Sequence, residues 1–76
     1  DIVAKMKQLI LNEDLDDATR SEVLELHQEL EDSVHAKKRT TIVNALISAI
    51  ATQVTSFAGT QIGALGDQLL QLPWFN

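Results

Sequence analysis

The sequence predicts an all-α fold, a small bundle of three or four helices. Apolar residues recur at helical spacing along most of the 76-residue chain, and runs that alternate apolar with polar residues are few. The β-branched residues follow the same helical spacing, which argues against strands. A chain of this length forms one domain of about half the usual size. We therefore expect a single helical domain over residues 1–76 and, because the chain starts at Asp1, a module of a longer protein.

The first helix is predicted over residues 2–12. Its apolar residues recur at helical spacing opposite Lys5 and Lys7, which is the pattern of a short amphipathic helix. The sequence NEDLDDAT that follows is rich in residues that favour caps and turns over helix interiors. The first helix should therefore end where this sequence begins.

The second helix is predicted over residues 17–39, and two starting points stay open. It can begin at Asp16, or at Thr19, which stands at capping-box spacing from Glu22. The basic residues 37–39 fall at its carboxyl end, where the helix dipole favours cations. A single apolar seam runs along this charged helix and consists of Val23, Leu26, Leu30 and Val34.

The third helix is predicted over residues 41–58 and has two faces. Thr40 or Thr41 can cap its start, and Gly59 can end it in the left-handed conformation. The apolar face consists of Val43, Ile47, Ile50, Val54 and Phe57. The opposite face is polar but uncharged and consists of Thr41, Asn44, Ser48, Thr52 and Thr55.

The last helix is predicted over residues 61–72. Thr60 or Asp67 can cap its start, and Pro73 limits its end because proline disfavours helix in the residue before it. Its apolar residues follow the 3, 4, 3 spacing of a coiled-coil seam and are Ile62, Leu65, Leu69 and Leu72.

Residues 40–66 carry no charge, a run of 27 that is long enough to cross a bilayer. A lipid-facing helix gains nothing from a polar stripe, and residues 42–65 include eight Asn, Gln, Ser or Thr among 24 positions. A row of small residues favours the membrane and consists of Ala51, Thr55, Gly59 and Gly63. We favour a bundle helix and keep a membrane-inserting or anchoring segment over residues 42–65 as the alternative.

The uncharged face of the third helix predicts contact with another protomer or domain, because charged residues are depleted at the centres of protein interfaces. A surface that happens to lack charge is the open alternative. Trp74 and Phe75 are expected to anchor in a groove of a neighbouring helix or protomer, unless the end of the chain frays. The candidate interface residues are Asn44, Ser48, Thr52, Thr55, Gly59, Gly63, Trp74 and Phe75. We expect a homo-oligomer or a helical partner domain.

Composition and spacing argue against several chemistries. The net charge is −5 and all six Lys and Arg residues lie within residues 1–39, so nucleic-acid binding is not expected. The chain has no cysteine, which excludes thiol chemistry and fits a reducing cytoplasm. His27, Glu31 and His35 stand four residues apart, but a helix turns the two histidines about 80° from each other. In place of a metal site we expect a half-buried His27 beside a solvated His35. We expect no metal site, no cofactor and no catalysis, since no serine has a recognisable base beside it.

The order of these features resembles a known class of modules. An amphipathic start is followed by LDDATRSEVLELHQEL, a basic break, an uncharged small-residue helix and a short leucine-rich end. This order is similar to that of small helical modules at the ends of bacterial stress and anti-phage defence proteins. The resemblance covers most of the chain and implies an accessory module that assembles or positions an effector elsewhere in a polypeptide. It transfers no functional residue.

Overall fold

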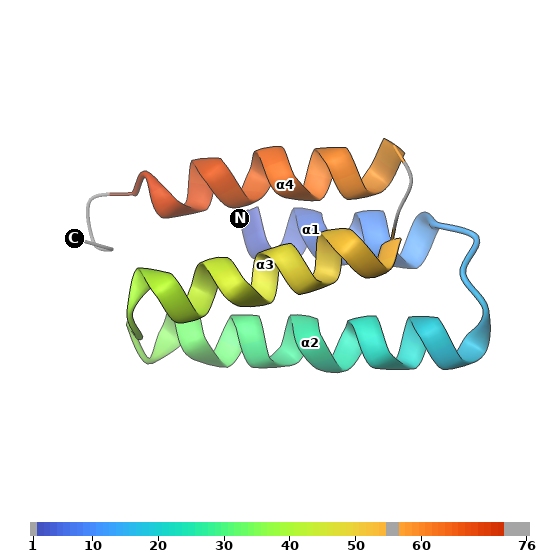
Figure 1. The fold of residues 1–76 in the computed structure, drawn as a ribbon, viewed down its shortest axis with the longest axis horizontal. Helices are drawn as coiled ribbons and strands as arrows, with labels where there is room; N and C mark the ends of the chain where they lie inside the picture. Colours follow the sequence, from blue (N-terminus) through green and yellow to red (C-terminus); the bar gives the residue numbers. More distant parts are fainter. Residues whose placement is uncertain (1, 55–56, 73–76) are drawn as a thin grey trace.

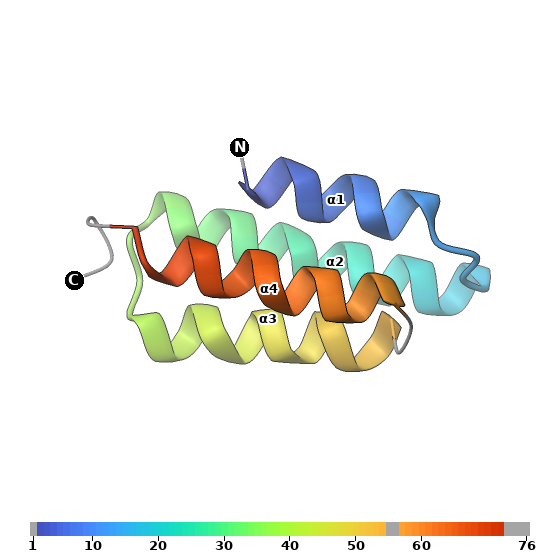
Figure 2. The same cartoon turned by 90° about the horizontal axis from the view of Figure 1, so that it is seen from above.

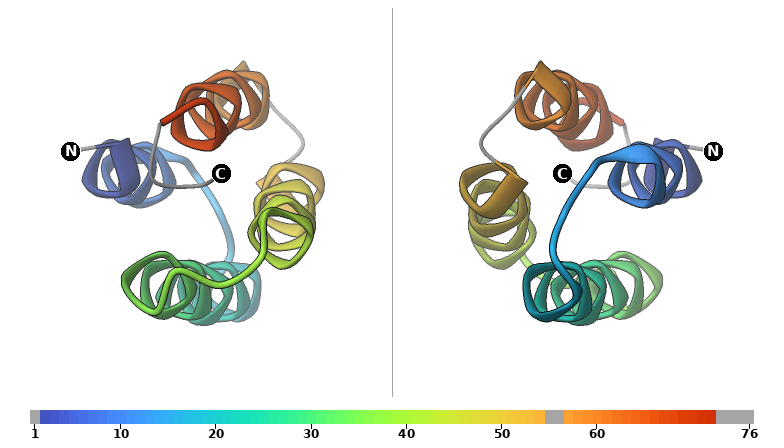
Figure 3. Two further views of the ribbon diagram at one scale, coloured as in Figure 1. Left: turned by 90° about the vertical axis from the view of Figure 1, so that its left-hand side faces the viewer. Right: turned by 90° about the vertical axis from the view of Figure 1, so that its right-hand side faces the viewer.

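The computed structural model describes residues 2–54 and 57–72, which form four helices arranged as a ring (Figure 1). The helices are α1 (Ile2–Asn12), α2 (Asp17–His35), α3 (Thr40–Val54) and α4 (Phe57–Leu70). Consecutive helices run antiparallel, and α1 packs against both α2 and α4, which closes the ring (Figures 2 and 3). No strand occurs within the described residues. The predicted all-α bundle is confirmed, with four helices.

The core lies along the axis of the ring, where all four helices direct their apolar residues. Its fully buried members from α1 and α2 are Met6, Ile10, Val23 and Leu30, and those from α3 and α4 are Val43, Ile50 and Ile62. The predicted seams are thus confirmed with one exception. Phe57 was placed on the buried face of the third helix, but 76% of its surface is exposed. The prediction was wrong because α3 ends at Val54 and Phe57 begins a new helix with a different orientation.

Asp16 is the residue that starts α2, which decides between the two predicted starting points. Its side-chain Oδ1 accepts a hydrogen bond from the backbone N–H of Thr19 at 2.7 Å, and its carbonyl accepts one from Arg20 N at 2.9 Å. Arg20 also donates from Nη2 to the Glu13 carbonyl oxygen at 3.1 Å. These bonds satisfy backbone groups that a helix start leaves unpaired and tie the connection from α1 to its beginning.

The end of α2 falls at His35, four residues before the predicted end at residue 39. Lys37 adopts a left-handed conformation with φ of 54°, and its N–H donates to the Val34 carbonyl at 3.1 Å. The N–H of Lys38 donates to the Ser33 carbonyl at 3.0 Å. This pair of bonds is the Schellman arrangement, which usually has glycine at the left-handed position. The basic cluster therefore forms the turn into α3, because the chain must reverse its direction there.

The boundary between α3 and α4 also differs from the prediction. α3 begins at Thr40, one residue before the predicted start, and the Arg39 carbonyl accepts hydrogen bonds from Ile42 N and Val43 N. It ends at Val54, and residues 55–56, between α3 and α4, lie outside the described residues.

The capping predictions for the last two helices were wrong at Gly59, Thr60 and Asp67, since all three lie inside α4. Gly59 was expected to end a helix in the left-handed conformation, but the described glycines have no positive φ. The absence of a side chain at Gly59 serves helix packing instead.

Two glycines allow α4 to approach α3 closely. A Cβ atom at Gly66 would lie 2.5 Å from Ile47 Cγ2, and one at Gly59 would lie 2.9 Å from the backbone carbonyl oxygen of Ala51. Neither distance leaves room for a methyl group. A Cβ at Gly63 would meet no atom within 4 Å, so this glycine makes no such contact. The α3–α4 contact therefore depends on Gly59 and Gly66, and Gly63, the last member of the small-residue row, takes no part in it.

Replacing Asp16 with asparagine should make the free energy of unfolding change less with pH in the acid range. Hydrogen bonds from the Thr19 side chain and then from its backbone N–H lower the pKa of Asp16. A carboxyl with a lowered folded-state pKa stabilises the protein above its unfolded pKa of about 4, and this contribution is lost as pH falls through the folded value. Asparagine caps helices as well as aspartate but does not titrate there. In urea unfolding, wild type should have a higher free energy of unfolding than Asp16→Asn at neutral pH, and the difference between the two proteins should shrink below about pH 4.

Alanine should have opposite effects at two glycines of α4. Gly66→Ala should lower the free energy of unfolding by about 1–3 kcal/mol, because its methyl group would overlap Ile47 in a packed interior. Gly63→Ala should raise it by about 0.5–1 kcal/mol, because alanine is the better helix former and its side chain meets open space. Denaturant unfolding followed by circular dichroism measures both. Equal effects at the two positions would contradict the close contact.

Candidate interaction surfaces

The outward face of α3 is an uncharged surface made of small side chains. Asn44, Ser48 and Thr52 are all exposed, and Ala45 lies among them on the same face. The Thr52 hydroxyl donates to the Ser48 carbonyl oxygen at 2.8 Å, so this polar group already has a partner within its own helix. We call Asn44, Ala45, Ser48 and Thr52 the α3 face. Contact with another protein would cover it without separating a charge from water.

The neighbouring helix α2 has an outward face of the opposite kind. Its exposed residues include four carboxylates, Glu22, Glu25, Glu29 and Asp32. The two faces meet where Gln53 Nε2 donates to Glu22 Oε1 at 3.2 Å. The change from charged to uncharged surface therefore follows the boundary between the two helices. One side of the bundle is suited to water, and the adjacent side has no charged group.

The remaining predicted interface residues do not join the α3 face. Gly59 is buried against Ala51 of its own chain, where its role is to let α4 pack on α3. Gly63 is half-buried on α4. Thr55, Trp74 and Phe75 lie outside the described residues. The structure thus brings together three of the eight candidates, Asn44, Ser48 and Thr52.

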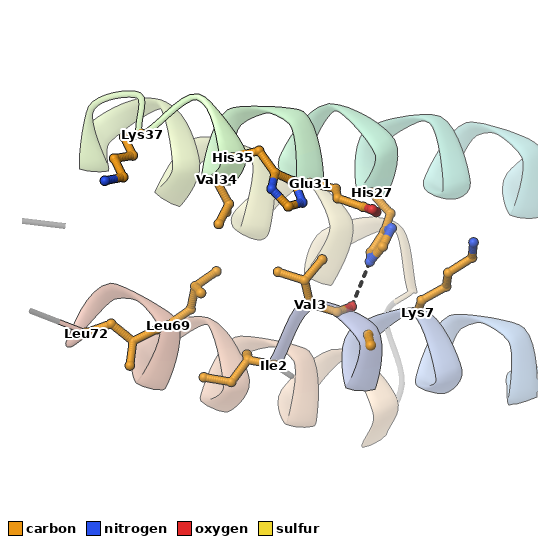
Figure 4. Close-up of a pocket in the computed structure, with 11 residues that line it drawn as sticks. Ile2, Val3, Lys7, His27, Glu31, Val34, His35, Lys37, Leu69 and Leu72 are labelled. Atoms are coloured by element: carbon orange, nitrogen blue, oxygen red, sulfur yellow. Dashed lines mark hydrogen bonds between the residues drawn. The ribbon is translucent and has the colours of Figure 1, made fainter. Parts of the chain in front are cut away.

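A cavity of about 780 Å³ lies where α1 begins, between the carboxyl ends of α2 and α4 (Figure 4). It exists because α1 has 11 residues and α2 has 19, so α1 starts well short of that end of the bundle (Figure 1). Its apolar walls are Ile2 of α1, Val34 of α2, Leu69 of α4, and Leu72, two residues after the end of α4. Its polar lining consists of Lys7, His27, Glu31, His35 and Lys37. Sequence analysis missed this cavity, although the unequal lengths of the predicted helices were the available signal.

His27 links the two helices on one side of this cavity. It is only 3% exposed, and its Nε2 donates a hydrogen bond to the Val3 carbonyl oxygen of α1 at 2.8 Å (Figure 4). The sequence predicted a half-buried His27 beside a solvated His35, and His35 is indeed exposed. His27 is buried more completely than predicted, because α1 covers it and supplies an acceptor for its ring N–H. Among the described residues, no three His, Asp or Glu side chains are placed to hold a metal ion.

Comparisons with known proteins leave the α3 face and the cavity as the basis for any functional argument. No protein-family model, no curated protein and no solved structure matches this chain. Across residues 2–54 and 57–72, no helix has both the length and the apolar character needed to span a membrane.

Alanine substitutions at the two histidines should separate a structural role from a surface position. His27→Ala should lower the free energy of unfolding by about 2–4 kcal/mol, because it removes a buried ring and leaves the Val3 carbonyl without this donor. His35→Ala removes an exposed side chain and should change the free energy of unfolding by less than about 0.5 kcal/mol. Denaturant unfolding of both variants at one pH measures the difference. A His27→Ala protein as stable as His35→Ala would contradict the role assigned to the His27 bond.

Proposed function

We propose that this chain is a non-enzymatic protein–protein interaction module that self-associates through the α3 face. The observation that carries the proposal is the exposed row of Asn44, Ser48 and Thr52 beside the strongly charged face of α2. A water-facing helix of an isolated domain usually carries charged residues, as α2 does. An interface centre is depleted of charge, as the α3 face is.

Two properties of the chain favour a second copy as the partner. A domain of 76 residues hides a smaller fraction of its unfolded surface than a larger domain does, and it has no cysteine with which to form a disulfide. Association is one way for such a domain to gain buried surface. Small side chains also let two helices approach to the 8–10 Å that is usual for packed helix axes. A two-fold dimer would then place the α3 faces of two copies against each other.

A helical domain of another protein is the other occupant that the α3 face would accept on the same grounds. This form of the proposal matches the accessory role that the resemblance to stress and defence modules implies. We place the module in the cytoplasm, since a chain without cysteine suits a reducing compartment. Insertion of residues 42–65 into a membrane is the alternative function, which liposome flotation tests directly.

A charge placed on the α3 face should weaken self-association without unfolding the bundle. Ser48→Lys puts an ammonium group at the centre of the proposed interface, where it must lose water and face its symmetry mate. We expect wild type to sediment as a dimer or larger and Ser48→Lys to dissociate at least about tenfold more readily, a change of about 1.4 kcal/mol. Sedimentation equilibrium over a wide concentration range measures the association, and circular dichroism checks the fold.

Ser21→Lys is the matched control, because Ser21 is exposed on the charged helix α2 and receives the same substitution. It should leave the association of wild type unchanged. A well-folded wild-type monomer at every concentration would refute self-association. Equal weakening by Ser48→Lys and Ser21→Lys would show that net charge, and not the α3 face, controls assembly. Flotation of wild type with lipid vesicles would instead support the membrane alternative.

A further inference from the structure

The outer side of α3 carries a seam of its own. Ile42, Ala45, Ala49 and Thr52 follow the 3, 4, 3 spacing of a coiled coil and fall within about 80° around the helix. We call these four residues the outer seam. α2 and α4 flank α3, and no helix among the described residues lies over this seam (Figure 3). Ile42 is a large apolar side chain, yet 45% of its surface is exposed. The outer seam therefore adds an uncovered apolar group to the α3 face.

The two ends of α3 carry opposite charges. Lys37, Lys38 and Arg39, which we call the basic turn, directly precede α3 and are all exposed. The other end of α3 lies beside Glu22, whose Oε1 accepts the hydrogen bond from Gln53 Nε2. α3 has 15 residues, so its ends lie about 22 Å apart at 1.5 Å for each residue. This separation is more than twice the Debye length of about 8 Å at physiological salt, so the two ends act as separate charged sites.

We propose that the α3 helices of two copies pair antiparallel, with the basic turn of each copy against Glu22 of the other. This orientation rests on self-association through the α3 face. A two-fold axis perpendicular to both helices keeps the α2 helices of the two copies on the same side of the contact. The basic turn of one copy then lies beside the start of α2 in the other, and symmetry repeats the contact at the opposite end. A parallel pair would bring the two basic turns together and leave Glu22 at the far end.

The side chains of the outer seam fit the same orientation. When two such seams pair antiparallel, the first residue of one packs beside the last residue of the other. Ile42 would meet Thr52 of the second copy, and Ala45 would meet Ala49. The two ends of the contact are then equally wide, and the alanines let the helices approach closely between them. A parallel pair would place two isoleucines at one end and two threonines at the other, which would hold the helices apart at one end only.

The absence of cysteine allows a direct test by disulfide formation. Ile42→Cys and Thr52→Cys place thiols about 15 Å apart along α3, and a disulfide needs Cα atoms within about 7 Å of each other. In a glutathione redox buffer, an equal mixture of the two variants should form the mixed disulfide in preference to either symmetric one. Ser21→Cys, on the exposed face of α2, measures disulfides that form by random collision.

The possible results separate the orientation from self-association itself. Symmetric disulfides of either variant in excess would indicate a parallel pair and overturn the orientation, while self-association would stand. Wild-type dimers whose cysteine variants form no more disulfide than Ser21→Cys would overturn both the orientation and the use of the α3 face. A wild-type monomer at every concentration would refute self-association, on which the orientation rests.

Charge exchange tests the contact between the basic turn and Glu22. Arg39→Glu should weaken association roughly three- to tenfold at low salt, because repulsion replaces attraction at both ends of the dimer. Lys5→Glu makes the same change in net charge at an exposed position on α1 and should leave association unchanged. Adding Glu22→Arg to Arg39→Glu exchanges the two charges and should restore association to near that of wild type.

Sedimentation equilibrium measures these associations, and circular dichroism checks that each variant is folded. An equal mixture of the single variants Arg39→Glu and Glu22→Arg provides a second measurement, since opposite charges would meet at both ends of their mixed dimer. This mixture should associate more tightly than either variant alone. A mixture no tighter than its components would overturn the pairing of the basic turn with Glu22.

Discussion

The close contact between α3 and α4 determines where every other helix can lie. Gly66 faces Ile47 and Gly59 faces the backbone of Ala51, at distances that exclude even a methyl group. With α4 held so near α3, the apolar residues of both helices point into one shared core that α2 borders on the other side of α3. A domain of 76 residues without disulfides depends on such close packing, since it has little buried surface to spare.

α1 is the shortest helix and closes the ring with few residues. Its fully buried Met6 and Ile10 each contribute roughly 1.5–3 kcal/mol of hydrophobic stabilisation, and the His27 bond to Val3 fixes its start against α2. Because α1 starts short of the last turns of α2 and α4, the arrangement that completes the ring leaves one end open (Figure 1). The cavity is thus a consequence of the difference in length between α1 and its neighbours.

Sequence reasoning predicted what depends on periodicity and missed what depends on tertiary contact. The four seams were found because apolar spacing reports which side of a helix is buried, and the α3 face was found because charge is visible in the sequence. The ends of helices were harder. Lys37 adopts a conformation that usually needs glycine, and Gly59 serves close packing where a helix end was predicted. At Gly59 the decisive contact is with Ala51 of the neighbouring helix, which local signals do not reveal. The cavity depends on relative helix lengths in space and escaped notice for the same reason.

The composition of the α3 face itself argues that it has a purpose other than helix stability. Thr, Ser and Asn are poorer helix formers than Lys, Glu or Ala, by up to about 0.7 kcal/mol for each residue relative to Ala. Asn44, Ser48 and Thr52 occupy exposed positions where nothing in the bundle demands a small side chain. The exposed face of α2, with its carboxylates, shows that this chain can place charged helix formers on a solvent-facing surface. A face that combines lower helix propensity with an absence of charge has the composition expected of the interface that we propose there.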